Sequence, residues 1–396
     1  MLSIKACRAC GSDRLLEFLD LGKQYLSDFR MDDEKPPKYP LVAVFCENCT
    51  LVQLKHTTPQ AEMYHERYGF KSGINESIRK DLDDVVSNAF QYVNNPRNWL
   101  DIASNDGTLL SFVPEDVYRV GVDPVEFLCV EAEDHADLIV NDYFGNCELP
   151  VFDVITSISC FYDMPNPNKF VSDVKEHLSK HGVWVIQQNY LLTTMELSAV
   201  DNFCHEHLEY YTLKSLENLL NRYDLEVFEV QTSPMNGGSI RTIVARTGTF
   251  QIDESVELQR EKERDYGVSL TKTYVDFAAR VGVELTKLNN LIRKLYHDGG
   301  SICILAASTR GATIWQAADI DSKYIIYAVE RNPAKVGANF SAIGVPIISE
   351  EDFRKQRPAY AIIGPWFFAD SIIERESEYL KAGGHLIVPL PEVRIV

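Results

Sequence analysis

Three carboxylates, Asp101, Asp123 and Asp142, stand at or just after the ends of short apolar segments. Such segments predict parallel strands, whose carboxyl ends meet at one edge of an α/β sheet, where open sheets bind nucleotides. The small residues from Ala103 to Gly107 let the backbone approach a ligand there, and Asp123 lies about twenty residues on, where a ribose diol would lie. We therefore expect a nucleotide-type ligand at this edge. The alternative is an ordinary α/β turn without a ligand.

The apolar pattern predicts seven strands for this sheet. They cover residues 99–102, 117–122, 138–140, 151–157, 183–188, 226–230 and 239–246. Helices are expected over 81–92, 170–178 and 213–223, and the segment 59–95 is expected to be rich in helix. The last two strands, separated by Gly237 and Gly238, should close the sheet as an antiparallel pair.

This order of acids and turn, without a GxGxxG motif, resembles the class I S-adenosylmethionine methyltransferases. The resemblance implies that the first acid or its turn holds the methionine part of the cofactor, the second acid the ribose and the third the adenine amino group. It also implies that Phe144 packs on the adenine. The implied cofactor-binding residues are Asp101, Ala103, Ser104, Asn105, Gly107, Asp123, Asp142, Tyr143 and Phe144.

Two Cys-x-x-Cys pairs near the start, Cys7 with Cys10 and Cys46 with Cys49, have the spacing of metal-binding knuckles. Together they offer four thiolates to one tetrahedral zinc ion. Four protein ligands leave no open coordination position, so a structural zinc is predicted. The alternative is four unbound thiols.

Composition limits the partners of the chain. Its 396 residues suggest two or three domains, and 45% hydrophobic with 24% charged residues is ordinary for a soluble globular protein. A formal charge of −19 opposes binding to a polyanion, which favours a small-molecule substrate over nucleic acid. No apolar signal region begins the chain and no long apolar run follows, so we expect a cytoplasmic protein that does not enter membranes. The sequence leaves open whether it is a monomer or a homo-oligomer.

A second group of polar residues surrounds His205-Glu206-His207. Two histidines that flank a glutamate, in a stretch without a clear apolar period, indicate a site; a surface cluster or a second metal site are the alternatives. The loop from Ser159 to Pro165, with Tyr162 and Asp163, and the strand end at Asn189 are expected at the same sheet edge.

Taken in order, the cysteine knuckles, the turn at 104–107, His205-Glu206-His207 and the strand entry at 236–241 resemble the sugar C-methyltransferases of deoxysugar biosynthesis. The resemblance implies a zinc-binding domain (1–60), a methyltransferase domain (61–247) and a C-terminal Rossmann-like domain (248–396). It implies methylation of a nucleotide-linked 4-keto-6-deoxyhexose at C3. The implied catalytic residues are His207 as general base, Glu206, His205 and Tyr68.

The resemblance also implies the acceptor-binding residues. They are Tyr68, Ser72, Tyr162, Asp163, Asn189, Cys204, Ser308 and Arg310. Tyr68 and Ser72 match a Tyr-x-Tyr-x-Ser motif in which Phe70 replaces the second tyrosine. Cys204 stands where the family has a pocket tyrosine, and Tyr162 or Asp163 where it has a histidine. These departures keep open two rivals, methylation at oxygen or nitrogen of another small acceptor and a non-catalytic scaffold that binds a sugar nucleotide.

The last third of the chain predicts a second Rossmann-like unit. One long helix or a broken pair should span 250–295, followed by strands at 301–306, 324–329, 361–364 and 386–390 and a helix from Thr313. The turn with Ser308 and Arg310 at a helix start suits a phosphate of the sugar nucleotide. Arg310 could instead form an ion pair, and Glu330 leaves a second dinucleotide site conceivable.

The implied chemistry needs a base to remove the proton next to a ketone, and the enolate then attacks the methyl group. Tyr68, His205 and Tyr162 are the candidates to stabilise the enolate oxygen.

Overall fold

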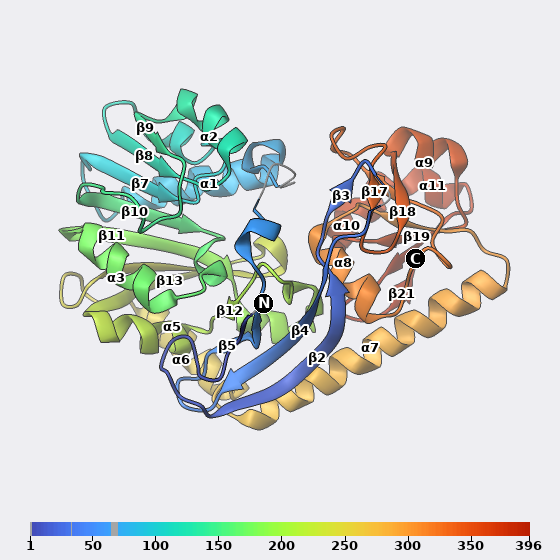
Figure 1. The fold of residues 1–396 in the computed structure, drawn as a ribbon, viewed down its shortest axis with the longest axis horizontal. Helices are drawn as coiled ribbons and strands as arrows, with labels where there is room; N and C mark the ends of the chain where they lie inside the picture. Colours follow the sequence, from blue (N-terminus) through green and yellow to red (C-terminus); the bar gives the residue numbers. More distant parts are fainter. Residues whose placement is uncertain (1, 33, 65–69) are drawn as a thin grey trace.

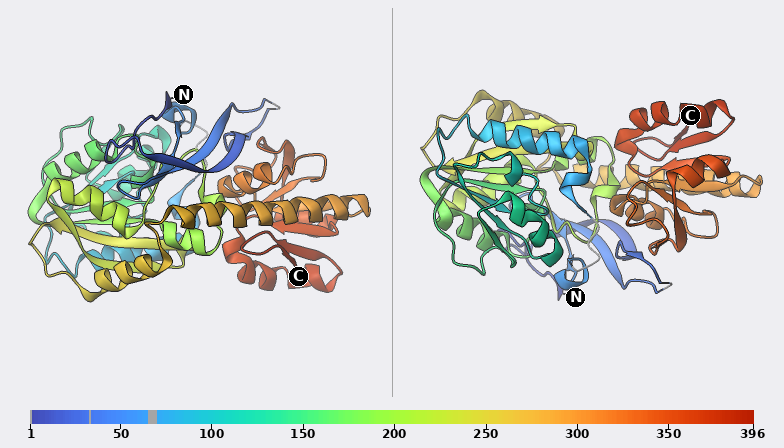
Figure 2. Two further views of the ribbon diagram at one scale, coloured as in Figure 1. Left: turned by 90° about the horizontal axis from the view of Figure 1, so that it is seen from below. Right: turned by 90° about the horizontal axis from the view of Figure 1, so that it is seen from above.

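The computed structural model describes residues 2–32, 34–64 and 70–396. These residues form two α/β lobes, which are bridged by the N-terminal strands β2 (Leu15–Tyr25) and β4 (Lys38–Cys46) and by the long helix α7 (Thr271–His297). Figure 1 shows both bridges running from one lobe to the other, and the two views of Figure 2 show α7 extending along the C-terminal lobe. None of the helices in these described ranges is both long and apolar enough to cross a membrane.

The first lobe contains the seven-stranded sheet that the sequence predicted. Its strands are β7 (Asn98–Ile102), β8 (Tyr118–Val122), β9 (Leu138–Val140), β10 (Phe152–Ile158), β11 (Leu178–Asn189), β13 (Leu225–Ser233) and β14 (Ser239–Arg246). In space they follow the order β9-β8-β7-β10-β11-β14-β13, parallel up to β11 and antiparallel beyond it. The α/β prediction is confirmed. Because the order reverses between β7 and β10, the carboxyl edge there forms a crevice suited to a ligand.

Side-chain caps set where several helices of this lobe begin. The helices are α1 (Glu76–Ala89), α2 (Glu126–Ala132), α3 (Pro167–His177), α4 (Leu191–Glu196), α5 (Leu213–Leu220) and α6 (Glu254–Tyr266). The first was predicted over 81–92, but the Asn75 side chain accepts the Ser77 N–H and starts the helix at Glu76. The helix expected over 170–178 likewise begins at Pro167, after the Asn166 cap.

The first 60 residues pair with both lobes. One sheet has the order β12-β5-β4-β2, in which β5 is Val52–Leu54 and β12 (Glu209–Tyr210) comes from the first lobe. Strand β3 (Phe29–Arg30) instead joins the sheet of the second lobe through β17 (Asn339–Phe340), and β1 (Leu2–Ser3) pairs with β6 (His56–Thr57). The sequence pattern did not predict this long hairpin.

The second lobe is the expected second Rossmann-like unit. Its other elements are β15 (Ile302–Leu305), α8 (Thr309–Ala317), β16 (Ala328–Glu330), β18 (Val345–Ser349), α9 (Glu350–Gln356), β19 (Tyr360–Ile363), α10 (Ala369–Arg375), α11 (Ser377–Lys381), β20 (His385–Val388) and β21 (Arg394–Ile395). The sheet order is β21-β20-β19-β15-β16-β18-β17-β3.

Two details of this region differ from the expected boundaries, and a third decides between two expected alternatives. Helix α8 starts at Thr309 rather than Thr313, because Ser308 caps it by accepting the Gly311 N–H. Only Ala328 and Val329 of the strand expected over 324–329 belong to β16. The helical stretch at 250–295 is a broken pair, and Gly267 ends α6 in the left-handed conformation, with φ of 83°.

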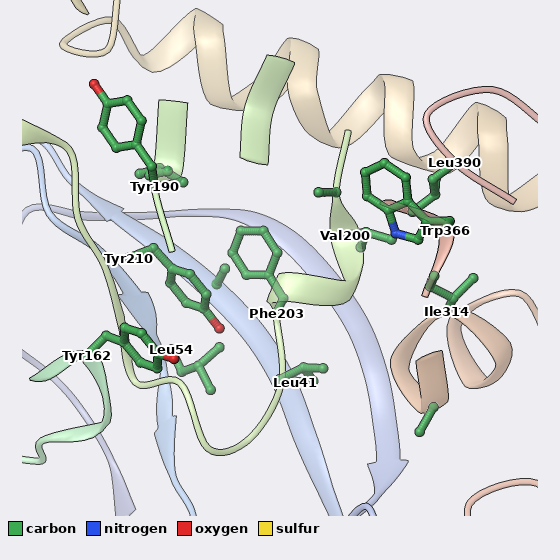
Figure 3. Close-up of a cluster of buried hydrophobic side chains, with 14 of the residues drawn as sticks. Leu41, Leu54, Tyr162, Tyr190, Val200, Phe203, Tyr210, Ile314, Trp366 and Leu390 are labelled. Carbon is green, nitrogen blue, oxygen red and sulfur yellow. The ribbon is translucent and has the colours of Figure 1, made fainter. Parts of the chain in front are cut away.

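A continuous hydrophobic core joins all three parts of the chain. Figure 3 shows Leu41 and Leu54 from the N-terminal strands near Phe203 and Tyr210 of the first lobe, with Trp366 of the second lobe beyond them. Strand pairing and core packing thus cross the domain boundaries predicted at residues 60 and 247. The division into three domains stays a prediction.

Candidate functional site

A pocket opens at the carboxyl edge of β7, β8, β9 and β10. Eight residues predicted to bind cofactor or acceptor line it: Ser72, Ala103, Asn105, Asp123, Asp142, Tyr143, Phe144 and Asp163. Ser159, Cys160 and Met164, from the loop that the sequence placed at this edge, line the pocket as well. Gln60 and Tyr64 also line it, although the sequence assigned neither a ligand. They follow the N-terminal sheet, and no local pattern shows that this segment reaches the strand ends.

The backbone of the turn after β7 has an unusual conformation. Ala103, Asn105 and Gly107 all have positive φ angles, of 59°, 52° and 75°. Gly107 lies outside the pocket lining. A Cβ atom there would come within 2.9 Å of Ala132 Cα, so this glycine lets the turn pack on the end of α2.

Asp123 is fixed at the centre of the pocket wall. Its Oδ2 accepts the Asn105 N–H at 2.9 Å, and its Oδ1 accepts the Val125 N–H at 2.8 Å. Burial raises the pKa of Asp123, and these two backbone hydrogen bonds act in the opposite direction. Each oxygen keeps a lone pair that can accept a hydroxyl.

Asp101 and Ser104 line a smaller adjoining cavity. Asp101 Oδ1 accepts the Thr156 hydroxyl at 2.7 Å, and burial raises the pKa of Asp101 to about 7. This carboxyl therefore lies behind the turn, whereas Ala103 and Asn105 face the main pocket.

Asn105 also ties the N-terminal segment to the pocket. Its Oδ1 accepts the Ser72 N–H at 2.9 Å, and its Nδ2 donates to Phe70 O at 3.3 Å. Ser72 is thereby brought beside the cofactor turn, as expected for a substrate residue. Tyr68 lies outside the described residues.

The third predicted acid caps the loop after β9. Asp142 Oδ1 accepts the Tyr143 N–H at 2.7 Å and the Asn146 amide at 2.9 Å. The hydrogen bond from Asn146 lowers the pKa of Asp142, which keeps the carboxylate charged. The Phe144 ring packs edge-on against Phe170 and presents an aromatic surface to the pocket.

His207 lies next to this pocket. Its ring packs against Tyr162, with 4.3 Å between centroids, and Tyr162 is followed by the pocket residue Asp163. His207 Nδ1 lies 3.0 Å from Asn202 O, so it carries the proton and Nε2 is the free base atom. Burial lowers the pKa of His207 to about 3, and the Arg310 charge adds to that effect. Glu206, next to it in sequence, does not raise this pKa.

Cys204 and His205, just before His207, are buried, and Glu206 is half-buried. His205 Nε2 donates to Tyr39 O at 3.1 Å, and burial lowers the pKa of His205 to about 4. Burial raises the pKa of the Glu206 carboxyl, and it raises that of the Cys204 thiol well above the usual value. The stretch is therefore not a surface cluster.

Arg310 reaches from the second lobe to the loop that carries His207. Its Nε lies 2.9 Å and its Nη2 2.7 Å from Asp201 Oδ2, and its guanidinium stacks 4.6 Å from the Phe367 ring centroid. Asp201 is only 1% exposed. The ion-pair alternative for Arg310 is therefore realised with a buried partner. Ser308 Oγ caps α8, and Asn189 ends β11 beside Ser239.

The four predicted zinc ligands converge. Their sulfur atoms all lie within 4.8 Å of one another, with Cys7 Sγ to Cys49 Sγ at 3.5 Å and Cys10 Sγ to Cys46 Sγ at 3.6 Å. Four sulfurs about 2.3 Å from one tetrahedral ion would stand at similar separations. Gln53 Nε2 donates to Cys7 Sγ at 3.1 Å, which supports the ligand from outside.

Comparisons with protein families match three consecutive parts of the chain. A zinc-binding domain matches residues 7–64, a methyltransferase domain 74–230 and a C-methyltransferase C-terminal domain 234–391. These matches favour an S-adenosylmethionine-dependent C-methyltransferase over the two alternatives, a scaffold and methylation at oxygen or nitrogen.

Individual relatives were also found. The chain is similar to C-methyltransferase NovU of Streptomyces niveus, with 27% identity over 99% of this chain and 97% of that protein. Among solved structures it is similar to an S-adenosylmethionine-dependent methyltransferase from Clostridium acetobutylicum (15% identity, 43% of this chain and 92% of that chain, TM-score 0.36). Another is the N-methyltransferase NodS of Bradyrhizobium japonicum (12% identity, 44% of this chain and 98% of that chain, TM-score 0.36).

We expect one equivalent of zinc per chain, and we expect Cys46→Ser to lose it. Because these ligands fix β4 and β5, removal of zinc should destabilise the folded protein, as in other structural zinc sites. Elemental analysis and thermal unfolding before and after chelation measure both effects. Cys303→Ser, at a buried cysteine of the second lobe, is the matched control and should keep the metal. Less than about half an equivalent, with all four thiols reactive, would contradict the site.

Proposed function

Because the chain belongs to the C-methyltransferases and uses S-adenosylmethionine, we propose that it methylates the carbon next to the ketone of a nucleotide-linked keto-deoxysugar. His207 is the proposed base. One observation carries this assignment: a half-buried imidazole, with Nδ1 bonded to Asn202 O, packs on Tyr162 at the edge of the proposed cofactor pocket. The resemblance of the sequence motifs to the sugar C-methyltransferases supports the acceptor class.

The proposed cofactor position is the pocket between the β7 turn and the β9 loop. Asp123 would hold the ribose hydroxyls, since both its oxygens are fixed by backbone N–H groups. The Asp142 carboxylate would accept from the adenine amino group, and Phe144 would cover the ring. The turn with Ala103 and Asn105 would hold the methionine part.

The proposed reaction consists of proton removal by His207 and methyl transfer to the resulting enolate carbon. His207 Nε2 takes the proton from the carbon beside the ketone, and the C–H electron pair moves into the enolate. When bound, S-adenosylmethionine supplies an electrophilic methyl group, so that a C–C bond forms as the S–CH₃ bond breaks and S-adenosylhomocysteine leaves. The chain holds the two reactants in register, which can supply much of the rate.

The nucleotide diphosphate of the acceptor would extend toward the second lobe. Arg310 already neutralises Asp201, but its fork has five N–H donors, so some are left for a phosphate. The N-terminal turn of α8 adds backbone N–H groups next to it.

Asp123→Ala should weaken binding of S-adenosylmethionine by about 1.5 to 3 kcal/mol, because two hydrogen bonds to a charged acceptor are lost. Isothermal calorimetry measures the affinity. Asp116→Ala removes an exposed acid that precedes β8 at the opposite edge of the sheet, and this control should bind normally. Unchanged affinity in Asp123→Ala would rule out the placement.

His207→Ala or His207→Asn should lower turnover by about a hundredfold or more while cofactor affinity stays nearly normal, since a positioned base is lost. Both variants should also stop solvent deuterium from entering the carbon beside the ketone when no methyl transfer occurs. Mass spectrometry and carbon NMR of the sugar measure exchange and the new C–C bond.

His205→Ala is the control for this test, because His205 Nε2 is already bonded to Tyr39 O. Its thermal unfolding must be checked, since the side chain is buried. If His205→Ala loses turnover and His207→Ala keeps it, the base lies two residues earlier. If both variants stay active, the proposed mechanism is wrong.

The pH dependence of kcat/KM should show that the proposed base, His207, stays unprotonated at moderately acidic pH. Since burial lowers the pKa of His207 to about 3, its ring is neutral above that value and gains a proton only below it. We expect kcat/KM to show no loss from His207 between pH 7 and pH 5, where an ordinary histidine would lose most of its activity. A pH–rate profile with an acid limb centred near 6.5 that persists in His205→Ala would contradict this.

A further inference from the structure

Asp163 stands between the cofactor pocket and the proposed base. It ends the short 3₁₀ turn Phe161–Asp163 after β10, lines the pocket and directly follows Tyr162, whose ring packs on His207. Asp163 is therefore the pocket residue next in sequence to the ring that packs on His207. The family resemblance implies only that Asp163 binds the acceptor, and the methylation chemistry described above assigns it no step.

The surroundings of Asp163 favour the neutral form of its carboxyl group. Oδ2 accepts the Tyr64 hydroxyl at 3.1 Å, and no Lys, Arg or His side chain of the described residues pairs with the carboxyl. Glu206 and Glu209, the titratable groups that face it, are acids too, so neither offers a compensating positive charge. Desolvation without a cation penalises the ionised form of a carboxyl, and it raises the pKa of Asp163 well above its usual range.

One oxygen of this carboxyl lacks a partner. Oδ1 of Asp163 is shielded from solvent and makes no hydrogen bond to any described residue. Buried polar atoms in folded proteins nearly always have a partner, so an unpartnered one beside a ligand pocket indicates that the ligand supplies it. A neutral carboxyl offers one O–H donor for that purpose.

Two of the other groups considered for the ketone oxygen have contacts of their own. His205 donates to Tyr39 O, and Tyr162 packs its ring on His207. Tyr68 lies outside the described residues.

We propose that Asp163, in its neutral form, donates a hydrogen bond to the ketone oxygen of the acceptor. This hydrogen bond becomes stronger as the ketone is converted to the enolate and its oxygen gains negative charge. This inference rests on the proposed function. The proton of Asp163 stays on its own oxygen; the carbon-bound proton goes to His207, and the negative charge settles on the acceptor oxygen. Asp163 is then a catalytic residue and helps select acceptors with a carbonyl at this position.

Two variants of Asp163 test whether its side chain acts as a hydrogen-bond donor or as a negative charge. Asp163→Ala removes the donor and should slow entry of solvent deuterium next to the ketone by about a hundredfold, the usual effect of losing one such donor. Asp163→Asn keeps the shape and an N–H donor, so it should stay within about tenfold of the unchanged protein. The assay is run in D₂O with S-adenosylhomocysteine and a panel of nucleotide-linked keto-sugars. Calorimetry of both variants should give affinities for S-adenosylmethionine within about threefold of normal.

Other outcomes would overturn the inference. Equal loss in Asp163→Ala and Asp163→Asn would show that a carboxylate, not a donor, is required. Normal deuterium exchange in Asp163→Ala would show that Asp163 does not stabilise the enolate. Normal exchange together with weak binding of S-adenosylmethionine would show that Asp163 contacts the cofactor only. If the unchanged protein neither exchanges deuterium nor forms a C-methylated product with any of these sugars, the proposed function fails, which is distinct from failure of Asp163 alone.

Discussion

The buried contact between Arg310 and Asp201 fixes the segment on which the candidate active site depends. Asp201 begins a stretch that has only one short 3₁₀ turn before β12, and that stretch carries His205, Glu206 and His207. Arg310 holds Asp201 through two nitrogens, and the next residue, Asn202, gives its carbonyl to His207 Nδ1. Removing one partner of a buried ion pair typically costs about 3 to 5 kcal/mol. The second lobe therefore sets the tautomer of a ring that belongs to the first.

Local patterns were enough to predict the cofactor edge. Asp101 lies in the last two residues of β7, and Asp123 and Asp142 follow β8 and β9 directly or after one residue. Sequence spacing alone therefore places the three acids at one sheet edge. The cysteine pairs were equally predictable, because each knuckle is a local turn. What the patterns lacked was orientation: Asp101 turns toward Thr156 rather than into the main pocket.

Contacts between distant residues could not be predicted in this way. Tyr64 meets Asp163 across 99 positions, and Arg310 meets Asp201 across 109. The pKa of His207 depends on such contacts, since its burial comes from Tyr162 and its neighbouring charge from Arg310. Strand β3 has two residues and pairs with β17 some 300 positions later, so no periodicity could reveal it.

The cysteine site is also connected to His207, through the sheet next to it. Gln53 bonds to the Cys7 sulfur, and its strand β5 pairs with β12, two residues beyond His207. Leu54 N donates to Leu208 O at 2.8 Å, and Arg8, between the first two cysteines, lies 3.6 Å from the buried Glu209. These contacts hold the irregular segment around His207 in place, and catalytic side chains in general need placement within about half an ångström. The metal module in this sense supports one wall of the candidate active site.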